Sequence, residues 1–107
     1  MAEPYQPEMF TPLKLRGLVL KNRIIKAATH DGASFEEMRR TYVRLARNDV
    51  ALCTVAYVAV SPVNKTFDNQ HHICRDNLAD WRQVCDAVHE AGGRMSAQVR
   101  QLCLCVV

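Results

Sequence analysis

The chain has 107 residues, of which 49% are hydrophobic, and this composition fits one small globular unit, or part of one, rather than a disordered tail. Fourteen Lys and Arg against eleven Asp and Glu give a formal net charge of only +3, and the basic residues are scattered among acidic ones, so no nucleic-acid partner is indicated. No apolar run approaches the roughly 20 residues of a membrane span, so no membrane partner is expected either. Five cysteines, an odd number, favour free thiols over a disulfide framework and predict a cytoplasmic protein.

A β-hairpin is predicted near the start of the chain. Two short alternating runs, residues 13–15 and 18–20, flank the turn Arg16-Gly17. The next run, residues 24–28, is mostly apolar and predicts a short strand covered on both faces.

A helix is predicted over residues 35–48. Ser34 and Glu37 have the S-x-x-E spacing of a capping box, which satisfies unpaired backbone N–H groups at a helix start. Apolar side chains then recur at steps of three and four residues and form one stripe for packing, with charged residues between them. The stripe consists of Phe35, Met38, Tyr42, Leu45 and Ala46.

The second half of the chain repeats the alternation of strand and helix. Residues 51–59 are rich in Val, Ala and Thr and predict a buried strand, and the polar stretch 61–76 predicts a long loop. Asn77 and Asp80 are candidate N-cap residues for a helix over residues 78–91. Its apolar stripe is Trp81, Val84, Cys85 and Val88, the pair Gly92-Gly93 ends it, and a third strand follows over residues 94–99.

This order predicts an α/β fold with parallel strands, because strand–helix–strand crossovers are right-handed and build parallel sheets. Such a sheet is either open and doubly wound or closed into a barrel. No G-x-G-x-x-G or G-x-x-x-x-G-K motif supports an open nucleotide-binding sheet. We therefore predict the N-terminal portion of a (β/α)₈ TIM barrel, consisting of a hairpin and about three βα units. A whole barrel needs about 250 residues, so the barrel is expected to be incomplete.

Three segments resemble the opening of the Old Yellow Enzyme-like NADH:flavin oxidoreductases. Residues 10–29 read FTPLKLRGLVLKNRIIKAAT and are similar to the family's hairpin and first strand, with residues 21–23 (KNR) as the most specific part. Residues 54–62 (TVAYVAVSP) resemble its second strand and the exit from it. Residues 86–98 (DAVHEAGGRMSAQ) resemble the helix and third strand that lead to the family's glutamine.

The resemblance implies a two-step hydride relay. In that family NAD(P)H reduces a bound FMN, and the reduced flavin passes hydride to a small-molecule electron acceptor such as an electron-poor alkene. The resemblance thus implies an FMN-dependent oxidoreductase of the ene-reductase or NADH oxidase type. Its site would form at the carboxyl ends of the barrel strands.

The resemblance also implies cofactor contacts. By position, Ala27, Ala28 and Thr29 match the end of the first strand, whose backbone approaches the flavin, and Ala59 matches a small residue at the end of the second strand that faces the ring. Gln98 is the strongest candidate, because its amide offers both a donor and an acceptor to the mixed edge of the flavin pyrimidine. Ordinary close packing of the small residues, and a solvent-facing Gln98, are the alternatives.

After Gln98 the sequence departs from that family. Where the family commonly has a histidine this chain has Gln101, and an apolar, cysteine-containing ending follows. We therefore divide the chain into an N-terminal part of an FMN-binding barrel, residues 1–98, and a divergent tail, residues 99–107, such as a frameshift, alternative splice or gene-model error would produce. No catalytic residue is assigned, and the chain is expected to be inactive alone. A non-enzymatic barrel fragment or gene-model product is the alternative function.

A metal-binding module is a weaker alternative. His71, His72 and Cys74, with Cys103 and Cys105, are N and S ligands of the kind that zinc favours. The usual C-x₂₋₄-C and H-x₃₋₅-H spacings are missing, so no metal is expected. The two histidines are more readily explained as loop residues, and a long loop at the carboxyl end of a strand could also border a substrate pocket.

Overall fold

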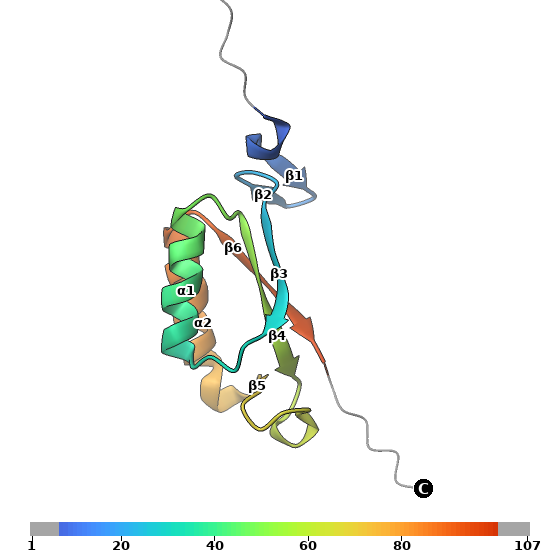
Figure 1. Cartoon of the computed structure of the whole chain (residues 1–107). Coiled ribbons are helices and arrows are strands. Elements are labelled where there is room, and N and C mark those ends of the chain that lie inside the picture. The colour runs from blue at the N-terminus through green and yellow to red at the C-terminus, as the bar shows by residue number, and fades with distance from the viewer. Residues whose placement is uncertain (1–6, 101–107) are drawn as a thin grey trace, which may run out of the picture.

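The computed structural model describes residues 7–100 and shows a parallel sheet with two helices on one of its faces (Figure 1). The helices are α1 (Phe35–Arg47) and α2 (Leu78–Glu90), and they lie side by side. An antiparallel hairpin, β1 (Leu13–Leu15) and β2 (Leu18–Leu20), follows a 3₁₀ turn (Glu8–Phe10) and lies at the end of the sheet where β3 begins. The predicted hairpin and both predicted helices are confirmed.

The central strand of the sheet is β4 (Leu52–Ala59). Strands β3 (Ile25–His30) and β6 (Arg94–Val99) each pair with it in the parallel sense, with Ile25 opposite Leu52 and Leu52 opposite Arg94. The prediction of three neighbouring parallel strands is therefore correct, and each crossover between them contains one helix.

The core lies between the helices and the sheet. Side chains of both helices and of β4 are buried together, as the helical periodicity predicts. Ser34 caps α1 by accepting a hydrogen bond from the backbone N of Glu37 at 3.2 Å, and the backbone of Gly92, at φ +93°, terminates α2. The buried side chains of this hydrophobic core are Met38, Tyr42, Ala46, Cys53, Val55, Val58, Val84 and Val88.

Residues 21–23 (KNR), the most specific part of the resemblance, connect the hairpin to the sheet. Asn22 is only 3% exposed, and its side chain donates to the carbonyl of Asp49 at 2.7 Å and accepts from the backbone N of Ile24 at 2.9 Å. The amine of Lys21 donates to the carbonyl of Ala46, near the end of α1. These bonds join the start of β3 to the end of α1 and the turn before β4. Lys21 and Asn22 therefore have a structural role in this connection.

The long loop expected over residues 61–76 contains ordered elements. Two 3₁₀ turns (Pro62–Asn64 and Arg75–Asn77) flank the two-residue strand β5 (His71–His72), which pairs in parallel with the end of β4. The structure also corrects the predicted capping of α2. Asn77 is the residue before the helix, but its side chain donates to the carbonyl of His72 and accepts from the backbone N of Cys74 instead of capping α2.

Both outer pairings of β4 contain an irregularity toward the carboxyl ends of the strands. Between Lys26 and Thr29, β3 has one residue more than β4, and between Val55 and Val58, β4 has one residue more than β6. An extra residue of this kind bends a strand and redirects its side chains, and it often occurs beside functional sites. The pairing is therefore irregular at Ala27 and Ala28 in β3 and opposite Gln98 in β6, where predicted cofactor contacts lie.

Candidate functional site

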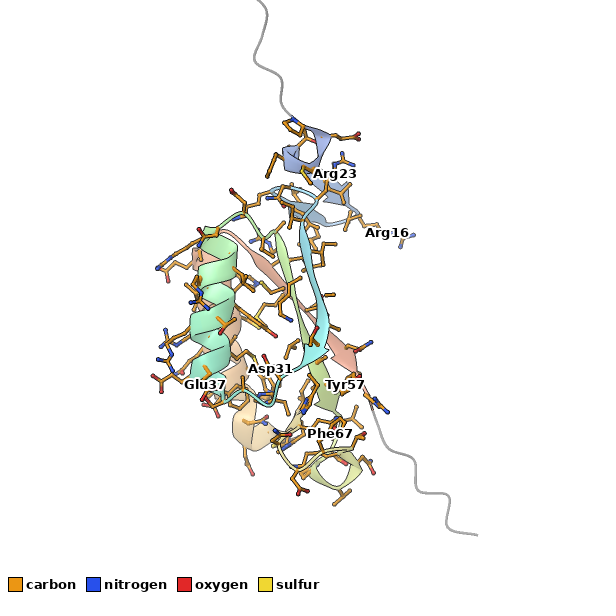
Figure 2. All side chains as sticks on the ribbon, in the orientation of Figure 1. Arg16, Arg23, Asp31, Glu37, Tyr57 and Phe67 are labelled. Carbon is orange, nitrogen blue, oxygen red and sulfur yellow. The ribbon has the colours of Figure 1, made fainter. Side chains whose placement is uncertain are left out.

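The candidate site is the carboxyl end of the parallel sheet. Figure 2 shows Tyr57 and Phe67 close together at this end, whereas Arg16 and Arg23 lie at the opposite end with the hairpin. The ends of β3, β4 and β6 converge there, as required of strands that run in one direction. Ligands of parallel α/β folds bind outside the carboxyl ends of the strands.

The five predicted cofactor residues differ in position and accessibility, because Ala27 and Ala28 lie opposite the segment 53–55 in the first half of β4 and the other three lie closer to the carboxyl end. Ala27 and Thr29 are exposed, Ala28 is half-buried, and Gln98 is exposed. Ala59 is 0% exposed, and its carbonyl accepts a hydrogen bond from the backbone N of Ile73 at 3.0 Å. The methyl group of Ala59 is therefore packed inside this structure, while the other four residues have accessible surface.

Gln98 lies on the face of the sheet away from the helices. Its neighbours Ala97 and Val99 pair with Val55 and Val58, which belong to the core under the helices, so alternation directs Gln98 to the other face. One step earlier on that face, the hydroxyls of Thr54 and Ser96 are 2.7 Å apart. Among residues 7–100 the Gln98 side chain has no recorded hydrogen-bond partner, so its amide is available to a ligand.

Three aromatic rings form a nearly parallel cluster at the same end. The ring centroids of His30 and Phe67 are 4.7 Å apart at 16°, and those of His30 and Tyr57 are 5.8 Å apart at 4°. A hydrogen bond of 3.1 Å between Nε2 of His30 and Oδ1 of Asn69 orients the imidazole, with Nε2 as the donor. Phe67 is still 43% exposed, so the cluster offers an apolar face to solvent.

A buried amide fixes the loop that carries Phe67. Gln70 is 3% exposed, and its Oε1 accepts from the backbone N of Thr66 at 2.6 Å and of Phe67 at 3.3 Å. Its Nε2 donates to the carbonyl of Arg100 at 3.2 Å. This one side chain therefore joins the loop after β4 to the end of β6.

The end of β6 brings a positive charge to the ring cluster. The guanidinium carbon of Arg100 lies 4.7 Å from the centroid of the Tyr57 ring, within cation–π distance. Sequence reasoning missed the group formed by His30, Tyr57, Phe67, Gln70 and Arg100. Its members are spread over 71 positions of the chain and share no motif, so only the ends of adjacent strands bring them together.

His71 of β5 is held by a backbone carbonyl and by two aromatic side chains. Nε2 of His71 donates to the carbonyl of Ala33 at 2.7 Å, and its ring packs against Phe35 and Trp81. Burial lowers the pKa of His71 below its ordinary value, although the bond to Ala33 acts in the opposite direction. His71 is thus a neutral packing residue between the loop after β3 and the start of α2.

Burial has the opposite effect on two acidic groups of the core. It raises the pKa of Tyr42 to about 12, with smaller contributions from Asp31 and Cys53. It also raises the pKa of the Cys53 thiol, against the nearby amines of Lys26 and Lys21. Both groups are therefore protonated at neutral pH and act as packing residues rather than as a nucleophile or a base.

The described part of the chain offers no metal centre. Within residues 7–100, no group of three or more His, Cys, Asp and Glu side chains lies close enough to hold a metal ion, and Cys103 and Cys105 lie outside the described residues. Over the same residues, neither helix is long and apolar enough to cross a membrane. The tail predicted over residues 99–107 is described only at Val99, which ends β6, and at Arg100.

Comparison with known proteins places this geometry among flavin enzymes. The model of the NADH:flavin oxidoreductase / NADH oxidase family matches residues 8–104. A 4,4'-dithiodibutanoate disulfide reductase of Rhodococcus erythropolis is 36% identical over 98 residues, and a probable N-methylproline demethylase of Rhizobium meliloti (strain 1021) is 35% identical over 101. These alignments cover 87% and 88% of this chain but only 24% and 15% of the relatives.

A solved structure shows the same arrangement of elements. The old yellow enzyme from Trypanosoma cruzi superposes with a TM-score of 0.73 and is 32% identical, over 89% of this chain and 27% of that one. The predicted fold, the N-terminal portion of a (β/α)₈ barrel, is confirmed by this likeness. The carboxyl ends of β3, β4 and β6 thus correspond to the end of the barrel where sites form.

Proposed function

Because the chain belongs to the NADH:flavin oxidoreductase / NADH oxidase family, we propose that it forms part of an FMN-dependent enzyme that uses NAD(P)H as hydride donor. The chain spans 24% and 15% of the curated relatives that it matches, so this activity is proposed for a complete barrel that contains residues 8–100. When bound, FMN supplies the ability to accept a hydride and to pass two electrons to an acceptor. The chain's own residues bind and orient that group.

The exposed amide of Gln98 carries the proposal. It lies on the face of the sheet away from the helices and has no recorded partner among the described residues, whereas the nearby Thr54, Ser96 and Gln70 side chains are hydrogen-bonded. A flavin pyrimidine presents both N–H and C=O groups along one edge. The two ends of an amide complement such an edge, so Gln98 would bind and orient the ring.

The small residues fit a flat ring to different degrees. Ala27 and Thr29 are exposed on β3 and leave room for a ring to approach the backbone beside the extra residue of that strand. Ala28 is half-buried. Ala59 fits least well, because its methyl group is 0% exposed. We therefore propose Ala27, Thr29 and Gln98 as the main contacts, with Ala59 supporting the strand end from beneath.

The Rhodococcus relative is named for the reduction of a disulfide, 4,4'-dithiodibutanoate, which is a small molecule that carries carboxylates and accepts electrons. We propose a small organic molecule of this class as the electron acceptor.

Reconstitution tests the proposed function. The 107-residue chain, mixed with FMN and desalted, is expected to stay colourless and not to oxidise NAD(P)H. The family places its phosphate-binding loops after the last barrel strands, and without them few contacts offset the ordering cost of binding. A chimera in which residues 8–100 replace the matching segment of the Rhodococcus reductase is expected to retain FMN and oxidise NADH or NADPH. A folded chimera without flavin would contradict the proposal and favour a non-enzymatic fragment.

A further inference from the structure

Arg100 is held at the candidate site with its charge unpaired among the described residues. The guanidinium lies over the face of Tyr57, 4.7 Å from the ring centroid. Within residues 7–100 the structure records one ion pair, between Arg23 and Glu8, and no carboxylate reaches Arg100. Because the ring covers the face of the guanidinium, the N–H groups in its plane remain able to bind a carboxylate with two parallel hydrogen bonds.

The backbone of Arg100 is fixed from both sides. Its N donates to the carbonyl of Val58 at 2.9 Å, which extends the pairing of β6 with β4. Its carbonyl accepts from the buried Gln70 at 3.2 Å. An arginine with an anchored backbone and a stacked head group loses less freedom on binding than a mobile one, so this residue is prepared to bind an anion.

The aromatic rings beside Arg100 favour an anion that has a flat, apolar part. The rings of Tyr57, His30 and Phe67 lie nearly parallel, and Phe67 is partly exposed. An apolar, flat part of a small molecule can pack on these rings while its acid group meets the guanidinium. Gln98, the proposed flavin contact, lies only two residues before Arg100 on the same strand end.

We propose that Arg100, stacked on Tyr57, recognises the carboxylate of the electron acceptor and so selects acidic acceptors. That the bound acid is the electron acceptor rests on the proposed function, but carboxylate recognition itself requires no flavin. The position of Arg100 supports this assignment, because an acid bound by its guanidinium would lie beside the end of β6 where Gln98 is located. A guanidinium forms charge-assisted hydrogen bonds with the ionised form of an acid, so the site would favour the carboxylate over the protonated acid.

A titration of the 107-residue chain without flavin tests the inference. The probes are benzoate and its neutral analogue benzamide, and the readout is the Nε–Hε resonance of each arginine side chain in ¹H–¹⁵N NMR spectra. Benzoate is expected to shift the Arg100 resonance with saturation, and benzamide is expected to leave it in place. Arg100→Gln should weaken benzoate binding by about tenfold or more, since a charged bidentate contact is lost.

Two further variants separate recognition from general effects. Tyr57→Leu removes the ring under the guanidinium and is expected to weaken benzoate binding, because the stacked head group loses its support. Arg16→Gln removes an exposed charge of the hairpin at the opposite end of the sheet (Figure 2) and should leave binding unchanged. Equal shifts of all arginines, or equal responses to benzoate and benzamide, would overturn the inference. Benzoate binding together with a flavin-free chimera would support it and contradict the proposed function, so the two failures are distinguishable.

Discussion

The side-chain Nε2 of Gln70 donates a 3.2 Å hydrogen bond to the carbonyl of Arg100, across 30 positions of the sequence. The same amide accepts two backbone N–H groups of its own loop. A residue that is 3% exposed and uses both ends of its amide sets the position of two strand ends at once.

Replacement of this amide should therefore destabilise the chain. Gln70→Leu leaves two loop N–H groups and the Arg100 carbonyl without their partner, at a cost of about 1–3 kcal/mol. Urea unfolding followed by circular dichroism measures the loss. The control is Gln83→Leu at an exposed position of α2, which is expected to change stability by less than about 0.5 kcal/mol. Equal stability of the two variants would mean that Gln70 has no anchoring role.

Gly93 is expected to tolerate no side chain. A Cβ atom at this position would lie 2.8 Å from Cβ of Ala46 and 3.2 Å from Cγ1 of Val88, and both neighbours are fully buried. Gly93→Ala should therefore cost about 1–3 kcal/mol through overpacking between the helices and β6. Gly17→Ala is the matched control, because no heavy atom lies within 4 Å of the added methyl group in the hairpin turn. The midpoints of thermal unfolding of the two variants should differ clearly, and similar midpoints would contradict the close packing described here.

Stability should fall on acidification because of His71. Its pKa is lowered by burial in the folded chain, while the unfolded chain has an ordinary pKa of about 6.5. Below pH 6.5 His71 therefore binds a proton in the unfolded chain but not in the folded chain. The free energy of unfolding decreases with falling pH until the pKa of His71 in the folded chain is reached. His71→Gln keeps a donor for the Ala33 carbonyl and should flatten this decrease. The pH dependence of the native chain and of His71→Gln is compared through urea unfolding midpoints measured from pH 7.5 to 5. Gln83→Leu is the control, because it removes no titratable group. An unchanged slope in His71→Gln would refute the assignment.

Gln98→Ala should weaken FMN retention in the chimera that contains residues 8–100. Loss of a two-sided polar contact leaves flavin edge groups unpaired, at a cost of roughly 1–3 kcal/mol, or a rise in the dissociation constant of about fivefold to a hundredfold. Fluorescence titration of the apoprotein with FMN measures it. Gln83→Ala, on the outer surface of α2, should bind FMN normally. Equal affinities in the two variants would remove Gln98 from the site.

Local sequence signals were sufficient for the helices and for the order of elements. Ser34 caps α1 through its own hydroxyl, and Met38, Tyr42 and Ala46 are spaced by the period of the helix. Both signals depend only on residues that are close in the sequence, so they can be recognised without the tertiary structure. The parallel arrangement also followed from order alone, because crossovers have one hand. The predicted side-chain cap by Asn77 is wrong, because the fold of the preceding loop brings the carbonyl of His72 close enough to accept from this side chain.

The sequence by itself therefore determined the hairpin, both α-helices and the three long parallel strands, and through the resemblance it predicts that Gln98 at a strand end contacts a flavin. Only the tertiary structure decided how the strand ends meet. The extra residues in β3 and β4 shift the register by one, which no periodic pattern reveals because alternation continues in the sequence while the pairing changes. The contact of Arg100 with Tyr57 depends on that register and on the buried amide of Gln70, so it exists only once β4, β6 and the loop between β4 and β5 are packed together.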